Sequence, residues 1–508
     1  MKSFSIDSNP IVSADKSFRS LFGVDSPMVE TVEIGESVIS IGNNAFEGFY
    51  KLKNITFPNS IVSIGSNSFC GTKLLEIELP QNLETIGEAA FLGSYLTSVT
   101  IPKSVHSIGK DAFGGYYGSM VANVVIEGDI DGLEICNVFG SSVEVCHLGE
   151  GVTKIDNRMF KDCSSLKSVS CSNTIDFIGS ESFRGCSSLE SFAIPMGVKS
   201  IGWGAFMDCY NLKEVSLPPS LQEVESVAFE NCRRLEKVLV IDIDAWWHID
   251  FKTYQSNPVT ISHDLMLNGA SVEHLVMPDD VDVVGLAQFK GLEKLKSVEL
   301  NNHVSEISAM AFDGCSALET INFPSSLTKI WGWAFRDCHS LNVSVDLSDT
   351  NVELLGGGSF LRCTSIPSVA LPASLKYIYT EVFKDDTSIK AVYSYINEPL
   401  NIAFDYASGY SLEPFACTLK DGNQQGQEYM TIYQHAVLYV PGGTTDSYRN
   451  SPIFREFSTI EEMNMSTDKK KVLIDKKCHS QTFDLKGRHA NERHVKGLYI
   501  NDGLKVIK

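Results

Sequence analysis

The chain has 508 residues, of which 43% are hydrophobic and 10% aromatic, a length beyond one ordinary hydrophobic core and a composition typical of a folded protein. Its formal net charge of −21 argues against nucleic acid or an anionic membrane surface as a partner, because their phosphates would repel it. The simpler interpretation of this charge is that it keeps a long protein soluble. The sequence has no run of about 18 apolar residues, so it predicts no membrane span.

Residues 1–29 precede the first clear repeat. We expect them to form an N-terminal cap or a ragged end, because the terminal coil of a stacked array exposes an apolar face. The segment from Met1 to Met28 has no continuous apolar stretch typical of a secretory signal. Two interpretations stay open: a signal has been removed and the protein is secreted or held at the cell surface, or the protein stays in the cytoplasm.

A repeated unit occupies residues 30–395. Phenylalanine recurs in it at intervals of 21 to 26 residues, with a single gap of 60. One unit reads roughly I-G-x-x-A-F-x-x-C-x-x-L-x-x-V-x-I-P-x-x-V-x-x, and a fixed period of this kind is typical of a solenoid. The phenylalanine anchors are Phe46, Phe69, Phe91, Phe113, Phe139, Phe160, Phe183, Phe206, Phe229, Phe289, Phe312, Phe335, Phe360 and Phe383.

Each unit is expected to contain two extended segments. Leu52, Ile55 and Phe57 point inward before Pro58, which ends the strand because proline cannot donate to the ladder. The same pattern predicts strands within 74–80 and 96–102. The Val-x-x-Ile-Gly stretch predicts a second short strand, with glycine permitting the turn, and Ala-Phe-x-x-Cys is expected to pack inward as an irregular or short helical turn.

This unit resembles the BspA-like class of leucine-rich repeats, a family of bacterial and protozoan surface proteins, in its Bacteroidota type. Clear copies begin at Ile178 and Ile201, and apolar anchors, Gly, Pro and Cys recur in phase through residues 30–395. The resemblance implies a mainly β, curved repeat solenoid with coils of about 22–23 residues, and a short C-terminal β-hairpin region.

Two stretches depart from the pattern. Residues 114–158 are degenerate, and a glycine-rich segment at 114–118 extends one loop. Residues 239–285 hold the long gap and resemble an insertion unit of gut-bacterial members of the family, which implies a modified repeat that stays inside the array. Within it, Asn268 and Gly269 predict a hairpin turn.

The chain beyond residue 395 divides into two further segments. Residues 396–465 resemble the closing unit of such arrays, in which a segment like that from Ala436 to Pro441 leads into a short helix, so we expect a C-terminal cap. Residues 466–508 are expected to form a linker and a β-hairpin segment. This last segment resembles C-terminal sorting domains of secreted Bacteroidota proteins. Two interpretations stay open: it has a sorting role, or it is a β-hairpin that only packs against the rest of the protein.

Thirteen cysteines invite a disulfide or metal interpretation. Residues one period apart would stack about 4.8 Å from each other, which is compatible with disulfides, yet several units replace the cysteine by unrelated residues. We expect a reduced, buried ladder, because free cysteine is among the most buried residue types; disulfides and a metal site remain alternatives. The ladder cysteines, each three residues after a phenylalanine, are Cys163, Cys186, Cys209, Cys232, Cys315, Cys338 and Cys363.

The sequence predicts no catalytic residue, no metal ligand and no cofactor. It contains no Cys-x-x-Cys, His-Glu-x-x-His, Gly-x-Ser-x-Gly or glycine-rich phosphate loop. A pocket formed by His248, Asp250 and His263 is an alternative to the simpler interpretation, in which His248 is a solvated loop histidine.

Aromatic residues at turns and in the insertion are the candidate ligand-binding residues, because such side chains act as interface hot spots and as platforms for sugars; local packing is the simpler interpretation for each. These candidates are Tyr116, Tyr117, Trp203, Trp246, Trp247, Trp331 and Trp333.

The family resemblance implies a non-enzymatic recognition or adhesion protein at the cell surface or secreted. It would bind a protein or glycan macromolecule through the extended repeat surface, as a monomer and without a nucleic-acid partner. Two alternatives stay open: a carbohydrate-binding accessory protein with Trp246 and Trp247 in its site, and a purely structural display scaffold.

Overall fold

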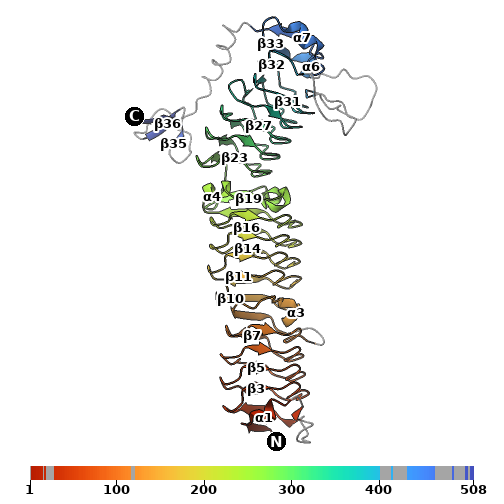
Figure 1. Cartoon of the computed structure of the whole chain (residues 1–508), viewed down its shortest axis with the longest axis vertical. Coiled ribbons are helices and arrows are strands. Elements are labelled where there is room, and N and C mark those ends of the chain that lie inside the picture. The colour runs from red at the N-terminus through yellow and green to blue at the C-terminus, as the bar shows by residue number, and fades with distance from the viewer. Residues whose placement is uncertain are drawn as a thin grey trace, which may run out of the picture. The chain divides into compact units, whose positions relative to one another are not determined.

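The structure, a computed structural model, describes residues 2–14, 17–18, 28–115, 120–400, 414–415 and 432–463, together with the backbone of short strands at 483–484, 498–501 and 504–507. The chain forms two compact units, Met1–Ser271 and Val272–Lys508, and each is described by itself (Figure 1). Both consist mainly of short, parallel-paired strands, so the predicted β-repeat solenoid is confirmed.

Successive coils of the first unit pair through two ladders of parallel strands, and each ladder is interrupted. The ladder of longer strands consists of three sheets: β1 (Ser3–Ile6), β2 (Thr31–Ile34) and β4 (Asn54–Thr56); β7 (Ser98–Ile101), β9 (Asn123–Gly128), β10 (Val145–Gly151) and β12 (Ser168–Cys171); and β14 (Ser191–Ala193), β16 (Glu214–Ser216), β18 (Lys237–Val240) and β20 (Leu265–Leu267). The ladder of two-residue strands consists of two sheets: β3 (Ser40–Ile41), β5 (Ser63–Ile64), β6 (Thr85–Ile86) and β8 (Ser107–Ile108); and β11 (Lys154–Ile155), β13 (Phe177–Ile178), β15 (Ser200–Ile201), β17 (Glu223–Val224) and β19 (Asp250–Phe251).

The second unit repeats this plan. Its ladder of longer strands consists of two sheets: β22 (His274–Val276), β24 (Ser297–Glu299) and β26 (Thr320–Ile321); and β28 (Val345–Asp346), β30 (Ser368–Leu371), β32 (Ala391–Ser394), β33 (Val437–Val440) and β34 (Thr459–Glu462). Its ladder of two-residue strands comprises β23 (Val283–Val284), β25 (Glu306–Ile307), β27 (Lys329–Ile330), β29 (Leu354–Leu355) and β31 (Tyr377–Ile378).

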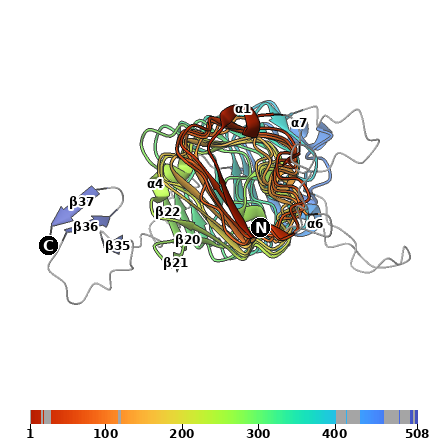
Figure 2. The same cartoon turned by 90° about the horizontal axis from the view of Figure 1, so that it is seen from below.

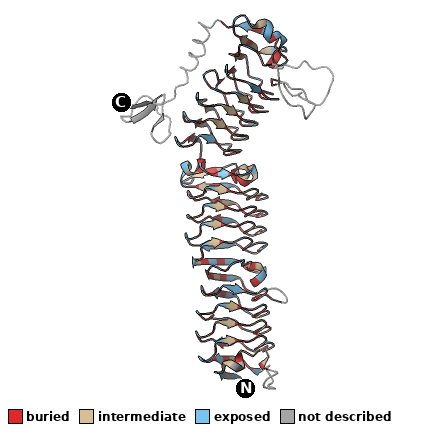
Figure 3. Cartoon of the chain, in the orientation of Figure 1, coloured by how far each residue is buried: buried red, intermediate tan, exposed pale blue. Residues whose placement is uncertain are grey.

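The longer strands alternate inward and outward side chains, as the two-residue period of a strand requires. In β16, Val215 is buried between the half-buried Glu214 and Ser216. Val215 pairs in register with Phe192 of β14 and Val238 of β18, so equivalent apolar side chains stack from coil to coil and fill the interior. Figure 3 shows buried residues recurring along the coils. Burial of each such side chain contributes about 1.5–3 kcal/mol.

Tight turns form the third side of each coil and carry the phenylalanine anchor. Phe206 is fully buried and stacks on Phe183 and Phe229, with ring centroids 5.0 and 5.2 Å apart and interplanar angles of 4° and 3°. Except at Phe139, the residue two positions before the anchor has a positive φ, as at Asn67 (54°) and Trp333 (58°). Seen along the stack, the coils of the first unit overlie one another around this interior (Figure 2).

One predicted strand is not formed. Within the described residues no strand lies between β5 and β6, although the pattern predicts one within 74–80. Leu74 and Leu79 are nonetheless buried, and the backbone N–H of Lys73 donates to Leu52 O across 2.8 Å. Apolar burial and the pairing of β6 with β5 and β8 therefore hold this coil in place, without a strand on its other side.

Both ladders continue into the atypical stretch that follows β18, where β18 pairs with β20 and β17 with β19. The extra length forms helices α4 (Ile243–Trp247) and α5 (Val259–Ser262) and the 3-10 helix η2 (Tyr254–Ser256). Asn268 and Gly269 have φ of 50° and 87° and link β20 to the antiparallel strand β21 (Ala270–Ser271). The predicted Asn-Gly hairpin is confirmed.

The ladder of the second unit ends with β33 and β34, which bracket helix α7 (Thr445–Asn450). Tyr448 of α7 is fully buried, and its hydroxyl lies 2.6 Å from Ser394 Oγ and 2.7 Å from Ile396 O. Helix α6 (Ile432–His435) precedes β33. Strands β36 (Leu498–Asn501) and β37 (Leu504–Ile507) form an antiparallel hairpin, with β35 (Phe483–Asp484) paired to β36.

Candidate functional site

The ladder cysteines satisfy backbone groups inside the coils. Each free ladder thiol is buried and donates to the carbonyl oxygen of a phenylalanine in the preceding coil, across 3.0–3.2 Å. Burial raises the pKa of these thiols, to about 12 at Cys232, which keeps them protonated and poorly nucleophilic. The six thiols are Cys186, Cys209, Cys232, Cys315, Cys338 and Cys363.

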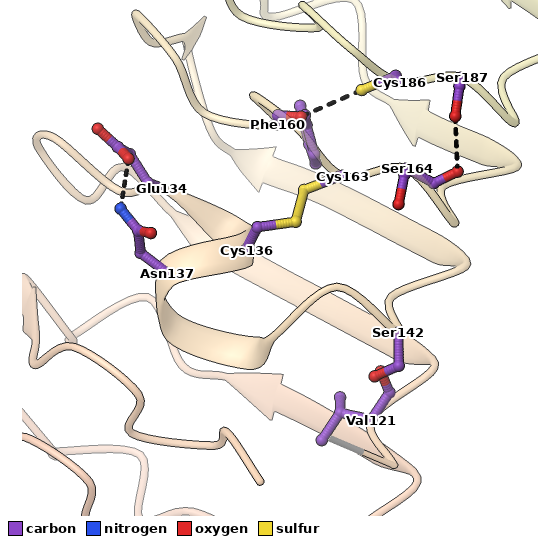
Figure 4. Close-up of a disulfide and its surroundings, with 10 residues drawn as sticks. All are labelled: Val121, Glu134, Cys136, Asn137, Ser142, Phe160, Cys163, Ser164, Cys186 and Ser187. Atoms are coloured by element: carbon purple, nitrogen blue, oxygen red, sulfur yellow. Dashed lines mark hydrogen bonds between the residues drawn. A yellow bond between two sulfur atoms is a disulfide. The ribbon is translucent and has the colours of Figure 1, made fainter. Parts of the chain in front are cut away.

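One ladder cysteine departs from this arrangement. Cys163 forms a disulfide with Cys136 of helix α3 (Ile135–Phe139), and their Cα atoms lie 5.7 Å apart (Figure 4). The prediction of a fully reduced ladder is therefore wrong at Cys163. Cys136 precedes its phenylalanine, Phe139, by three residues instead of following it, so the pairing depends on the local turn of α3.

Trp246 and Trp247 lie in α4 and are both buried, at 1% and 4% exposure. The side chain of Asp242 caps α4 by accepting from the backbone N–H of Asp244 across 2.9 Å, and Trp246 packs on Phe251 with ring centroids 5.3 Å apart. The expectation that these two rings form a surface platform is wrong, because α4 directs both into the interior. The carbohydrate-binding alternative loses the site predicted for it.

The three residues weighed as a histidine pocket each have a local structural role. The ring nitrogen Nδ1 of His248 lies 2.9 Å from Asp244 O. Asp250 accepts from Lys252 Nζ across 2.6 Å, and His263 ends α5 in the left-handed conformation with φ of 56°. His248 and Asp250 thus contact residues of their own segment.

Three predicted aromatic residues do lie at the surface. Trp203 is 43% exposed in the first unit, and Trp331 and Trp333 are 39% and 45% exposed in the second. Tyr116 and Tyr117 lie outside the described residues. Ligand binding by any of these side chains stays a prediction.

Two exposed tyrosines that the sequence analysis missed accompany Trp331 and Trp333. Tyr377 and Tyr379 are 53% and 38% exposed, and we call these four residues the aromatic patch. The register of β27, β29 and β31 places equivalent residues of three successive coils in columns. One column holds Lys329, Leu354 and Tyr377, and the column two residues further along holds Trp331, Gly356 and Tyr379.

Charged neighbours orient Trp331. Its indole Nε1 donates to Glu306 Oε2 across 2.9 Å. Lys329 Nζ donates to Glu306 Oε1 across 2.7 Å and lies 5.7 Å from the centroid of the Trp331 ring. The hydrogen bond from Lys329 and, to a smaller extent, that from Trp331 lower the pKa of Glu306. This carboxylate therefore stays ionised and holds both side chains.

Trp333 is held by a second set of contacts. The guanidinium carbon of Arg336 lies 5.3 Å from the centroid of the Trp333 ring, at the long end of a cation–π contact. Arg336 is itself fixed by Asp313, to which it donates from Nε across 2.8 Å and from Nη2 across 2.7 Å. Both indoles of the patch are therefore positioned before any ligand arrives.

A shallow, open groove crosses the outside of the first unit. Its lining residues are Asn59, Ser60, Val62, Asn82, Glu84, Ser104 and His106. The hydroxyls of Ser60 and Ser104 each donate to a backbone carbonyl across 2.6 Å, and Asn82 donates to the carbonyl of Asn59 across 2.9 Å. These polar groups join neighbouring coils.

In the part of the chain that the structure describes, no group of three or more His, Cys, Asp or Glu residues is arranged to hold a metal ion. No helix there is long and apolar enough to cross a membrane.

The sequence matches the family profile of the BspA type leucine rich repeat region, in six copies over residues 22–134, 137–245 and 259–390. No curated protein matches the chain.

Several solved structures are similar. A leucine-rich repeat protein of Bacteroides ovatus is 25% identical, with 72% of this chain and 84% of that protein covered and a TM-score of 0.41. A leucine rich cell surface protein of Faecalibacterium prausnitzii is 21% identical, with coverages of 48% and 85% and a TM-score of 0.21. The leucine rich repeat protein of T. pallidum is 24% identical, with coverages of 44% and 80% and a TM-score of 0.24.

Proposed function

The chain belongs to the BspA-type leucine-rich repeat family, and from this premise we propose that it is a recognition protein that binds a macromolecule, a protein or a glycan, without chemical turnover. The family match indicates a repeat scaffold, and no catalytic family is indicated. One observation carries the proposal: stacked phenylalanines and hydrogen-bonded thiols fill the described coils, whereas the four side chains of the aromatic patch lie exposed together on the second unit.

The physical argument follows from the architecture. A solenoid buries side chains between neighbouring coils and so offers an extended outer surface. Binding energy on such a surface comes mostly from a few anchors, and Trp and Tyr are enriched among them. Exposed apolar clusters on a folded protein commonly mark interaction sites. The aromatic patch is thus the best-supported contact surface, in place of the buried Trp246 and Trp247.

We further propose that the protein is secreted or held at the cell surface, as a monomer. The disulfide between Cys136 and Cys163 supports this, because disulfides persist in oxidising compartments outside the cytoplasm. Alkylation of the protein in its native cells without reductant, followed by mass spectrometry, should leave this pair unlabelled. A fully alkylated pair would contradict the extracellular location. Light scattering should give a molar mass near 55.9 kDa for a monomer.

The binding proposal is tested by titrating the intact chain against immobilised extracellular-matrix proteins and polysaccharides. We expect saturable binding to at least one, with the ligand recovered chemically unchanged. Trp331→Ala and Trp333→Ala should each weaken binding, whereas Trp203→Ala, which removes an exposed indole from the other unit, serves as the matched control. Failure to bind any of these proteins or polysaccharides would favour the display-scaffold alternative. Chemical turnover of one of them would contradict the non-catalytic function.

A further inference from the structure

The aromatic patch spans three successive coils of one ladder. The outer coils contribute Trp331 and Trp333 on one side and Tyr377 and Tyr379 on the other. Parallel strands lie about 4.8 Å apart, so the Trp331 and Tyr379 positions are separated by about 10 Å along the coils. A ligand that covers the patch is therefore longer than a single small ring.

The middle coil has three consecutive glycines, Gly356, Gly357 and Gly358. A Cβ atom built at Gly358 would lie 2.7 Å from Cδ1 of Trp333, so the indole lies directly on bare backbone. A Cβ atom at Gly357 would lie 3.9 Å from the Cβ of Tyr379, which approaches from the other coil. Because the three glycines carry no side chain, they place none between the tryptophans of one outer coil and the tyrosines of the other.

The charges around the patch are neutralised within the protein. Lys329 pairs with Glu306 across 2.7 Å, and Lys376 pairs with Glu353 across 2.7 Å. Arg336 pairs with Asp313, whose side chain is almost fully buried. Each of these three cations already has a carboxylate partner, and the chain carries a net charge of −21. A sulfated or uronate polymer would have to break an ion pair to bind.

These observations together assign a ligand class, and we propose that the aromatic patch binds a neutral glycan built of hexopyranose units. The inference rests on the proposed recognition function and names its ligand. A pyranose ring presents an apolar face of C–H groups that stacks on indole and phenol rings. Its hydroxyls both donate and accept, which matches the ammonium group of Lys329 and the carboxylate group of Glu306 beside the Trp331 ring.

The same surface fits a protein partner less well. The core of a protein–protein interface is depleted of Lys, Glu and Asp relative to the rest of the surface. Here Lys329 and Glu306 directly adjoin the ring of Trp331. A sugar chain can use these groups at the edge of each stacked ring.

The test is affinity electrophoresis of the full chain in native gels that contain hydroxyethyl cellulose, β-1,3-glucan, galactomannan or glycogen, with heparin and polygalacturonate as anionic controls. We expect retardation by at least one neutral polysaccharide and by neither anionic one. Calorimetry with a hexasaccharide of the retarding polymer should give tighter binding than its monosaccharide. Trp333→Ala should weaken binding by about tenfold or more, and Trp333→Tyr should restore part of it.

Trp203→Ala is the matched control, since this indole is equally exposed but lies in the other unit; its affinity should stay within about twofold of wild type. Melting temperatures of all variants should match, which separates loss of a contact from loss of fold. No retardation by any of the four neutral polymers, or equal loss in Trp203→Ala, would overturn the glycan inference. If the protein instead binds a matrix protein that the neutral glycans do not displace, the glycan inference fails and the proposed recognition function stands.

Discussion

Replacing Phe206 by alanine probes the stacked interior at its most regular point. The ring is fully buried and lies between Phe183 and Phe229 at 5.0 and 5.2 Å, nearly parallel to both. Buried Phe→Ala substitutions cost about 3–5 kcal/mol. These two stacked contacts and a tilted contact with Phe192, whose ring centroid lies 5.7 Å away, are each worth roughly 0.5–1.5 kcal/mol and are lost together. We therefore expect a loss in the upper part of the first range.

The assay is guanidinium unfolding followed by far-ultraviolet circular dichroism and by alkylation of Cys209 and Cys232, whose thiols lie in the same stack of coils. The control is Phe57→Ala, which removes a half-buried ring with an edge contact to Phe69 at 5.7 Å and should cost less than half as much. A loss below about 1 kcal/mol at Phe206, within the range of surface substitutions, would refute the claim that the phenylalanine stack holds the coils together.

Three further predictions concern buried titratable groups. In native protein without reductant, site-resolved alkylation should modify the half-buried Cys171 long before the ladder thiols; fast labelling of the ladder would contradict their burial. Burial raises the pKa of Cys232 from 9.0 to about 12 in the folded state. The protonated thiol therefore stabilises the folded state fully below pH 9, and this contribution is lost between about pH 9 and 12. The free energy of unfolding should fall there by up to about 1.4 kcal/mol per pH unit for each such thiol, and Cys232→Ala should reduce the slope seen in urea melts. Asp386 occupies the ladder position in its coil, and burial raises the pKa of its carboxyl well above 3.8. It therefore stabilises most at pH values below about 4 and progressively less as pH rises, so Asp386→Cys should flatten the fall in melting temperature between pH 5 and 8; an unchanged profile would contradict this.

The sequence predicts the repeat well because each coil depends on residues near in sequence. The spacing from Phe183 to Phe206 to Phe229 fixes the stack, and the Asn268-Gly269 pair fixes its hairpin through φ values of 50° and 87°. Such features depend on local backbone preference and on a period, both of which a sequence displays.

The remaining features depend on three-dimensional register. The direction of Trp246 and Trp247 is set by how α4 sits on its coil, and a tryptophan pair looks the same in sequence whether it is buried or exposed. The disulfide of Cys136 was missed because that residue is out of phase with the ladder. Tyr377 and Tyr379 become neighbours of Trp331 only through the pairing of β27, β29 and β31.

The most direct test of the account is the equilibrium affinity of wild type and of the double variant Trp331→Ala/Trp333→Ala for the macromolecule retained in the binding panel. Both indoles are exposed and fixed by neighbouring charges, so the double variant should fold normally. It should bind about a hundredfold more weakly, as expected for the loss of two anchors of about 1.4 kcal/mol each. Mass analysis should recover the bound macromolecule unaltered. Unchanged affinity in the double variant, or a chemically modified ligand, would contradict recognition through the aromatic patch.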